Sequence, residues 1–396
     1  MAWVFRDRVA VAGVGYSAFT RRSERSLAEL AIEACDAALA DAGLARADVD
    51  GLATSPSMPR YGGAKGTIDG IDVVTPYLLT DLLGIGDRLL WTGSTNGMVT
   101  QSVIDAALAI AAGLCRHVLV YRALHVPKGR YANFESSHAG GPEQFLAPYG
   151  FTAPPAWAAT AMRRYFELFG YSRADFARYM IDNRANAAAN PNAYWRGKPL
   201  SREEYLGARM IADPVSILDC DIPVDGCAAI LLTATERARD LRQPPALLTG
   251  FAASTTAAPG GAPMTLESLW DGAAQTADRL WASSGLGPAD VDTAQLYDGF
   301  SLFVLTWLEG MGFVPRGEGL ARLRDGYGAR GGVLPINTGG GALGEGRLHG
   351  MTHIAEAVLQ VTGRGGARQV PGASRSLVTV SNGLTKSVAF LFSADR

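Results

Sequence analysis

The chain is poor in cysteine. Its 396 residues contain only four, and no two of them form a C-x-x-C pair: Cys35, Cys115, Cys220 and Cys227. Four scattered thiols cannot supply a disulfide framework for a chain of this length. The scarcity excludes a disulfide-stabilised secreted domain and predicts a reducing, cytoplasmic environment.

Long apolar runs and blocks of like charge are missing as well. No stretch reaches the roughly 18 consecutive apolar residues of a membrane-spanning helix, and the start, MAWVFRDRVAVAGVG, lacks the pattern of an export signal. The formal net charge is −2, from 36 basic and 38 acidic side chains. We therefore expect no membrane anchor and no nucleic-acid surface, and partners that are small molecules or proteins.

What the chain does contain is a repeat. SLAELAIEACDAALADAGLARADVDGLATS, from Ser26, and TLESLWDGAAQTADRLWASSGLGPADVDTAQLYDGF, from Thr265, share an amphipathic helix, a glycine stop, the letters ADVD and a strand. Ser26 begins a predicted capping box, and Gly43 and Gly285 stand where the two helices are expected to end. The same supersecondary unit is therefore predicted twice.

This duplication predicts an α/β fold of two similar halves, residues 1–240 and 241–396. The chain length also favours two core units. Between the repeated elements of the first half lies a stretch of about 121–211 that the second half lacks. Long extra segments inside compact domains are usually functional, so we expect this insertion to cover the active site.

Five segments spread over nearly the whole chain carry a family resemblance. They are GYSAFTRRSERSLAELAIEA, VLVYRALH, NPNAYWRGKPLSREEYLGARMIADPVSILDCDIPVDGCAAILLT, LYDGFSLFVLTWLEGMGF and NTGGGALGEGRLHGMTHIAEAV. Together they resemble the thiolase superfamily, and within it the lipid-transfer-protein branch related to the thiolase part of sterol carrier protein X. The resemblance implies a thiolase-like fold with layers in the order αβαβα.

The positions that carry thiolase chemistry in that family have changed in this chain. The nucleophilic cysteine position falls on Asn96, beside Ser94, and the second cysteine position falls on Ser381. The N-E-A-F motif becomes Y-D-G-F at 297–300, and G-H-P-x-G becomes G-R-L-H-G at 346–350. A Claisen-type exchange needs a thiolate to carry the acyl group, so we expect no thiolase reaction.

Family members with Y-D-x-F and LHGM motifs resemble aldolases that cleave β-hydroxyacyl-CoA thioesters, notably steroid side chains. A retro-aldol reaction breaks a carbon–carbon bond without an acyl-enzyme. A base takes the β-hydroxyl proton, and donors hold the departing carbanion as a thioester enolate. The resemblance implies a lyase that releases a ketone or aldehyde and a short acyl-CoA, with no cofactor beyond the coenzyme A of the substrate.

Four side chains are the candidate catalytic groups. Tyr297 is the first choice for the base, although it could simply pack its ring. Its phenol pKa, ordinarily about 10, must be lowered by a nearby cation, for which Arg347 is the candidate. The related aldolases carry a second tyrosine at the position of Arg347, so a two-tyrosine mechanism does not transfer directly. His349 is either a donor to the enolate or a structural histidine, and Asp298 is either an alternative base or, as we favour, a turn residue.

Five further positions are expected to border the thioester. Two stand at the former cysteine positions, one stands near the first of them, and two stand in the glycine-rich loop NTGGGALGEG: Asn96, Ser381, Ser94, Gly340 and Gly341. Glycines there let the backbone approach a ligand closely. The loop is no P-loop, since the closing Lys-Ser/Thr is absent.

Basic and histidine residues leave several interpretations open. Arg122, Lys128 and Arg130 either face the phosphates of coenzyme A or, as we favour, form a solvated basic loop. His349 and His353 are four residues apart, a spacing that puts both on one helix face, but no third ligand is evident and we expect no metal.

Other functions and partners also follow from the residues and the resemblance. An acyltransferase would use Ser94 or Ser381 as nucleophile, and a non-catalytic carrier would bind acyl-CoA or lipid without turnover.

The resemblance implies a homodimer and a small OB-fold acyl-CoA-binding partner protein. The chain has four lysines, so we expect no imine chemistry, with Lys386 as the one credible exception.

Overall fold

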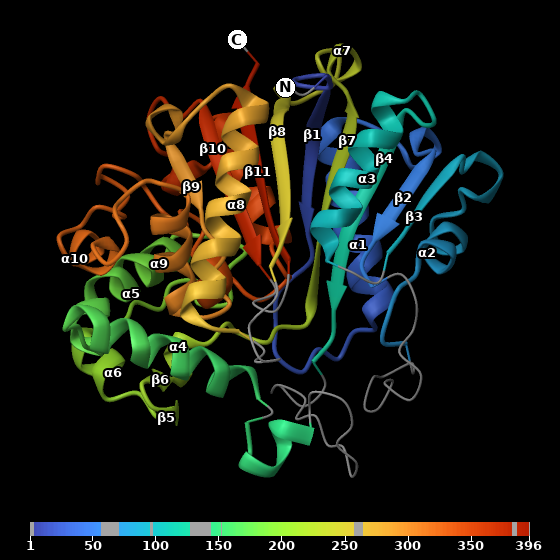
Figure 1. The fold of residues 1–396 in the computed structure, drawn as a ribbon. Helices are drawn as coiled ribbons and strands as arrows, with labels where there is room; N and C mark the ends of the chain where they lie inside the picture. The colour runs from blue at the N-terminus through green and yellow to red at the C-terminus, as the bar shows by residue number, and fades with distance from the viewer. Residues whose placement is uncertain are drawn as a thin grey trace.

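The computed structural model describes residues 4–56, 71–95, 98–126, 144–151, 153–256, 264–381 and 386–395. Figure 1 shows its elements along the chain. The first part comprises β1 (Val9–Tyr16), α1 (Leu27–Ala42), η1 (Arg46–Asp48), β2 (Gly51–Thr54), α2 (Pro76–Leu83), η2 (Gly86–Arg88), β3 (Trp91–Ser94), α3 (Val99–Ala111) and β4 (His117–Leu124). The middle part comprises η4 (Ala147–Tyr149), α4 (Pro154–Phe169), α5 (Arg173–Ala188), α6 (Arg202–Leu206), β5 (Met210–Ala212), β6 (Val215–Ser216), η5 (Ile217–Asp219), β7 (Gly226–Ala234) and α7 (Thr235–Ala238). The last part comprises β8 (Ala246–Thr255), α8 (Leu266–Ser284), η7 (Pro288–Asp290), β9 (Thr293–Gln295), α9 (Ser301–Gly310), α10 (Gly319–Arg324), α11 (Gly341–Gly344), α12 (Met351–Val361), η8 (Gly366–Arg368), β10 (Arg375–Ser381) and β11 (Lys386–Ala394).

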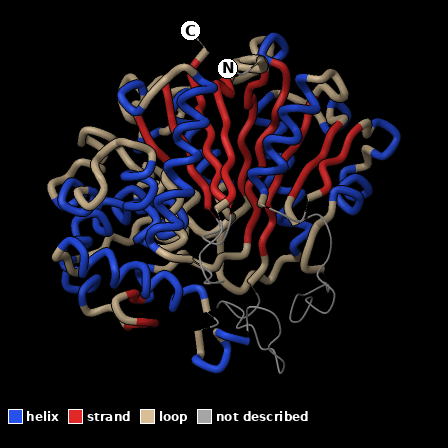
Figure 2. The backbone as a smooth tube through the Cα atoms, viewed as in Figure 1, coloured by secondary structure: helices blue, strands red, loops and turns tan. Residues whose placement is uncertain are grey.

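Within the described residues, nine strands from both halves of the chain form one mixed sheet, whose strands lie side by side in Figure 2. Their order is β3-β2-β4-β7-β1-β8-β11-β10-β9. β1 and β8 lie antiparallel at its centre. Outward from this pair the arrangement repeats: β7 and β11 come next, then β4 and β10, then β2 and β9, which run parallel to β4 and β10. The α/β fold class predicted from the sequence is confirmed.

The helices cover the sheet, and their ends obey the predicted capping signals. α1 packs on β1, β7 and β4, α8 packs on β8 and β11, and α12 reaches β7 as well as β9 and β10. In Figure 1, α3 and α8 lie in front of the sheet and α1 behind it. The Ser26 amide donates to the Glu29 carboxylate at 2.8 Å, and the Glu29 amide donates to the Ser26 hydroxyl at 3.2 Å. Gly43 and Gly285 end their helices in the left-handed conformation, as predicted.

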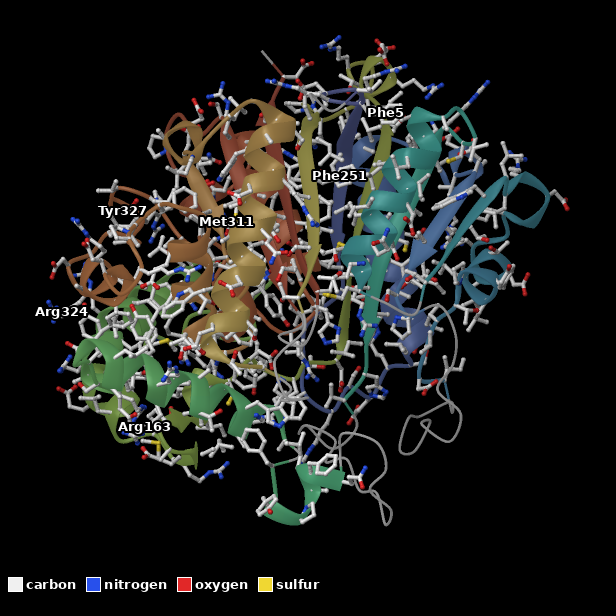
Figure 3. The ribbon with its side chains drawn as sticks, viewed as in Figure 1. Phe5, Arg163, Phe251, Met311, Arg324 and Tyr327 are labelled. Atoms are coloured by element: carbon white, nitrogen blue, oxygen red, sulfur yellow. The ribbon has the colours of Figure 1, made fainter. Side chains whose placement is uncertain are left out.

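The extra segment of the first half begins later than predicted. β4 stays paired with β7 as far as Leu124, so residues 121–124 belong to the sheet and not to the insertion. Beyond them, α4 packs on α8 and α9, and α5 packs on α10 and α11, as a helical group beside the sheet (Figure 1). Arg324, labelled in Figure 3, joins this group to α10 by donating to Asp175 at the start of α5 at 3.0 Å.

Among the residues that the structure describes, no helix combines the length and the apolar character needed to cross a membrane.

Candidate active site

Tyr297 follows β9, and its side chain is buried in close contact with neighbouring residues. Its amide donates to the Thr379 hydroxyl of β10 at 3.2 Å. Its ring stacks on Phe303 with 6.3 Å between centroids and lies tilted against His353 at 5.6 Å. A Cβ atom at Gly299 would stand 2.9 Å from the ring and 3.1 Å from the phenol oxygen, so only glycine leaves the ring its place. The phenol is therefore positioned by packing from several elements.

The carboxylate of the neighbouring Asp298 is occupied by hydrogen bonds within the protein. Its carboxylate accepts from the amides of Ala342 and Leu343 at 2.6 and 3.3 Å, and from His353 Nε2 at 3.0 Å. The side chain is fully buried. These contacts fix the start of α11 and the ring of His353, which supports a structural role for Asp298 over that of a base.

Arg347 faces a carboxylate that the sequence did not single out. Its Nε lies 4.0 Å from Oδ1 of the buried Asp221. The backbone around Asp221 joins the loops of the site: the Asp221 amide donates to the Gly299 carbonyl at 3.0 Å, and the Arg347 amide donates to the Ile222 carbonyl at 2.9 Å. The string DIPVDG, in which Asp221 stands, combines buried apolar residues with turn formers, so nothing local marks it as part of the site.

The charges around Tyr297 oppose one another. Burial raises the pKa of Tyr297 above its ordinary value, the Asp221 carboxylate raises it further, and Arg347 lowers it. Burial also raises the pKa of Asp221 from 3.8 to about 7, although Arg347 lowers it. Arg347 thus acts in the predicted direction, but the pKa of the phenol is raised overall, chiefly because the phenol is buried and in part because the Asp221 carboxylate stands beside the same cation.

Arg122 is part of this site and not of a solvated loop. It lies near the end of β4, is only 6% exposed, and donates through Nη1 to the Ala123 carbonyl at 2.8 Å. Its Nε and Nη2 contact His349 Nδ1 at 3.3 and 3.0 Å. The favoured interpretation of Arg122 as a solvated basic residue was wrong, because β4 continues into the interior. Lys128 and Arg130 lie outside the described residues.

The two histidines do not share a helix face. His349 precedes α12, which begins at Met351, and has a positive φ of 53°. His349 meets Arg122, whereas His353 meets Asp298. Among the described residues, no group of three or more His, Cys, Asp or Glu side chains could hold a metal ion.

Gly340 and Gly341 are buried against the protein itself. A Cβ at Gly340 would lie 2.5 Å from the Ala187 Cβ, and one at Gly341 would lie 2.2 Å from an Asp298 oxygen. Three asparagines hold the loop by donating to the carbonyls of Gly340, Asn337 and Gly339 at 2.9, 3.2 and 2.9 Å: Asn183, Asn186 and Asn190. The middle segment thus fixes the glycine-rich loop, and contact of the glycines with substrate stays a prediction.

The remaining expected positions are described only in part. Ser94 ends β3 and Ser381 ends β10, but their side chains, like the whole of Asn96, lie outside the described residues. All four cysteines are free and buried, and burial raises the pKa of Cys115 and Cys220 to about 12 and also raises the pKa of Cys35 and Cys227. No cysteine of this chain is therefore suited to act as a thiolate nucleophile.

Comparison with known proteins assigns the chain to a family. Residues 263–392 match the model of thiolase C-terminal domain-like sequences. The chain is 37% identical to 17-hydroxy-3-oxo-4-pregnene-20-carboxyl-CoA lyase of Mycobacterium tuberculosis, over 96% of this chain and 98% of that protein. It is 36% identical to a steroid side-chain-cleaving aldolase of Thermomonospora curvata, over 99% of this chain and 100% of that protein. The chain belongs to this aldolase family of the thiolase superfamily.

Solved structures support the assignment of this chain to the aldolase family. The chain matches the Ltp2-ChsH2(DUF35) aldolase with a TM-score of 0.86 and 34% identity, over 100% of both chains. It matches human mitochondrial 3-ketoacyl-CoA thiolase with a TM-score of 0.71 and 14% identity, over 98% of this chain and 100% of that one, a likeness of fold alone. The thiolase-like fold and the family that the sequence motifs predicted are confirmed.

Proposed function

We propose that the chain catalyses the retro-aldol cleavage of a β-hydroxyacyl-CoA thioester whose acyl group is a steroid side chain. The observation that carries the proposal is the identity of 36% and 37% to two steroid-cleaving enzymes over nearly the full length. The burial of every thiol supports the same conclusion, because a retro-aldol reaction needs no acyl-enzyme.

The reaction balances without an oxidant or a metal. The bond between the α and β carbons breaks, its electron pair stays on the α carbon as a thioester enolate, and the β carbon becomes the carbonyl of a ketone or aldehyde. The proton lost from the β-hydroxyl returns to the α carbon. The site must therefore accept one proton, stabilise one oxyanion and give one proton back.

In this proposal Tyr297 takes the hydroxyl proton and Asp221 makes this possible. The raised pKa of the phenol disfavours a lone tyrosinate at neutral pH. When Asp221 holds a proton, its negative charge is gone. The positive charge of Arg347 then lowers the pKa of the phenol without opposition from that carboxylate, and burial is left as the main cause that raises it. Tyr297 and Asp221 thus share one proton as a pair. Arg347 stabilises whichever member of the pair is ionised.

A panel of β-hydroxyacyl-CoA esters, analysed by mass spectrometry, tests the reaction. We expect a steroid-chain substrate to yield a steroid ketone and a short acyl-CoA in equal amounts, with no adduct on Lys386 after borohydride treatment, since Lys386 Nζ donates to Gln101 at 2.7 Å. Tight binding without product for every ester would instead favour a carrier. Labelling of the protein by an acyl group would favour an acyltransferase.

We propose further that the working unit is a homodimer with a small OB-fold acyl-CoA-binding partner. β3 is an edge strand of the sheet, which suits pairing with a second copy, and the matched Ltp2-ChsH2(DUF35) aldolase is named for two components. Light scattering at micromolar concentration should give the mass of two chains. Co-expression with the partner from a neighbouring gene should raise turnover, and a monomer with full activity alone would contradict both expectations.

A further inference from the structure

We infer that Arg122 fixes His349 as a neutral imidazole with its proton on Nε2, so that His349 serves the site as a hydrogen-bond donor and not as a cationic acid. The expected acceptor of this hydrogen bond is the thioester oxygen as it becomes an enolate oxygen, and this part of the inference rests on the proposed function. The protonation state and tautomer of the ring follow from the contacts with Arg122 alone.

An arginine side chain has only donors. The guanidinium presents Nε and Nη2 to the same ring nitrogen, His349 Nδ1, at 3.3 and 3.0 Å. Nδ1 must therefore accept, which leaves the single proton of a neutral ring on Nε2. A proton added to Nδ1 would break both hydrogen bonds and place two cations in contact.

The guanidinium is itself held in place. Arg122 is nearly buried in β4, and Nη1 donates to the carbonyl of Ala123 at 2.8 Å. Two donors converge on one acceptor, so the ring plane as well as the tautomer is constrained. Arg122 is therefore a positioning residue for His349, contributed by the first half of the chain to a loop of the second.

The backbone at His349 is kept in a costly conformation that supports this contact. A φ of 53° is left-handed, a region that a residue with a Cβ rarely occupies. The next residue, Gly350, has a φ of 95°, and a Cβ there would lie 2.4 Å from Val380. The close contact between Gly350 and β10 fixes the loop and so places the imidazole of His349 beside Arg122.

The pair also lies within electrostatic range of the proposed base. Burial raises the pKa of Tyr297, and four charged side chains act on it: Asp221 and Asp298 raise it, whereas Arg347 and Arg122 lower it. A neutral donor adds no charge to this balance, whereas an imidazolium would add a third cation. A neutral imidazole is also the form that polarises a carbonyl without giving up its proton.

The tautomer can be read directly by NMR of protein labelled with ¹⁵N-histidine. The chain has five histidines, and the signals of His349 are assigned by their loss in His349→Gln. In the wild type we expect one unprotonated nitrogen, Nδ1, and one protonated nitrogen, Nε2, unchanged between about pH 5.5 and 8.5, the range over which an ordinary histidine titrates. A ring that titrates in this range, or that carries its proton on Nδ1, would overturn the inference.

Two variants separate the arginine's role from a general loss of structure. Arg122→Met removes both donors and should let His349 titrate near the ordinary value of about 6.5 with mixed tautomers, while Arg122→Lys, which keeps a cation and a donor, should preserve the wild-type signal. With substrate, Arg122→Met should lower kcat about 10- to 100-fold with little change in KM. An unchanged tautomer in folded Arg122→Met would refute the role of Arg122. If the tautomer shifts as expected but no ester is cleaved even by the wild type, the proposed function fails and not the assignment of the ring.

Discussion

Tyr297→Phe is expected to lower turnover by about 100- to 10,000-fold while binding of the CoA ester stays nearly intact, the usual cost of losing one general acid/base group. The ring keeps its contacts with Phe303 and His353, and only the oxygen beside Gly299 is removed. Steady-state kinetics on a substrate found in the ester panel measures kcat, and equilibrium titration with the same ester measures binding. Wild-type turnover in this variant would place the base elsewhere, with Asp221 and Asp298 next to be tested.

Arg347→Ala is the matched control for that variant. Arg347 lowers the pKa of both Tyr297 and Asp221, so its loss raises both pKa values. The groups that must be ionised for turnover then ionise only at higher pH. Part of the lost rate should therefore return as the pH rises. No such recovery is expected in Tyr297→Phe, because it has no phenol to ionise. Equal and pH-independent losses in both variants would remove the electrostatic link between them.

Asp221→Asn is expected to make the protein more stable and less active at neutral to basic pH. The pKa of Asp221 is raised from 3.8 to about 7 by burial, so the folded state binds its proton more tightly than the unfolded state does. The contribution of the group to stability is therefore fully present below about pH 4 and is lost as the pH rises through about 7. The interval between 3.8 and about 7 corresponds to about 4 kcal/mol at pH 8, an upper value for the gain from a neutral amide.

Thermal or denaturant unfolding at pH 4 and pH 8 measures the first part of this expectation. The variant should gain on the order of 2–4 kcal/mol over the wild type at pH 8 and little at pH 4. Turnover at pH 7 should fall about 10- to 100-fold, since an amide cannot hold the proton that the phenol gives up, and should recover in part at higher pH. A variant that is both less stable at pH 8 and fully active would show that Asp221 is an ordinary structural carboxylate.

The proton shared by Tyr297 and Asp221 also leads us to expect a loss of wild-type turnover at low pH. Below about pH 7 a second proton enters the Tyr297 and Asp221 pair, and no acceptor is left for the substrate hydroxyl. Turnover should therefore decline as the pH falls through about 7. In Asp221→Asn this decline in turnover should occur at higher pH, because it then depends on the pKa of the Tyr297 phenol alone.

Local signals in the sequence were enough for the repeated helices and their ends, and motifs spread over the chain were enough for the family. Helix caps such as Ser26 with Glu29, and glycines such as Gly43 and Gly285, act within a few residues, so their consequences are visible in a string of letters. The same holds for Tyr297, which stands in a recognisable motif at the end of a strand. The lack of a cysteine at the expected nucleophile position also excluded thiolase chemistry from the sequence alone.

The sequence by itself thus determined an α/β fold of the thiolase superfamily, a site without a thiolate and the place of Tyr297, Arg347 and His349 in its loops. Only the tertiary structure decided which charges meet there: Asp221 beside Arg347 and Arg122 on His349. Arg122 and His349 are 227 positions apart, and Asp221 lies in a string with no local signature. The direction of the Tyr297 pKa depends on burial and on the sum of these distant charges, so it is set by the packing of the whole fold and not by the residues next to Tyr297 in the chain.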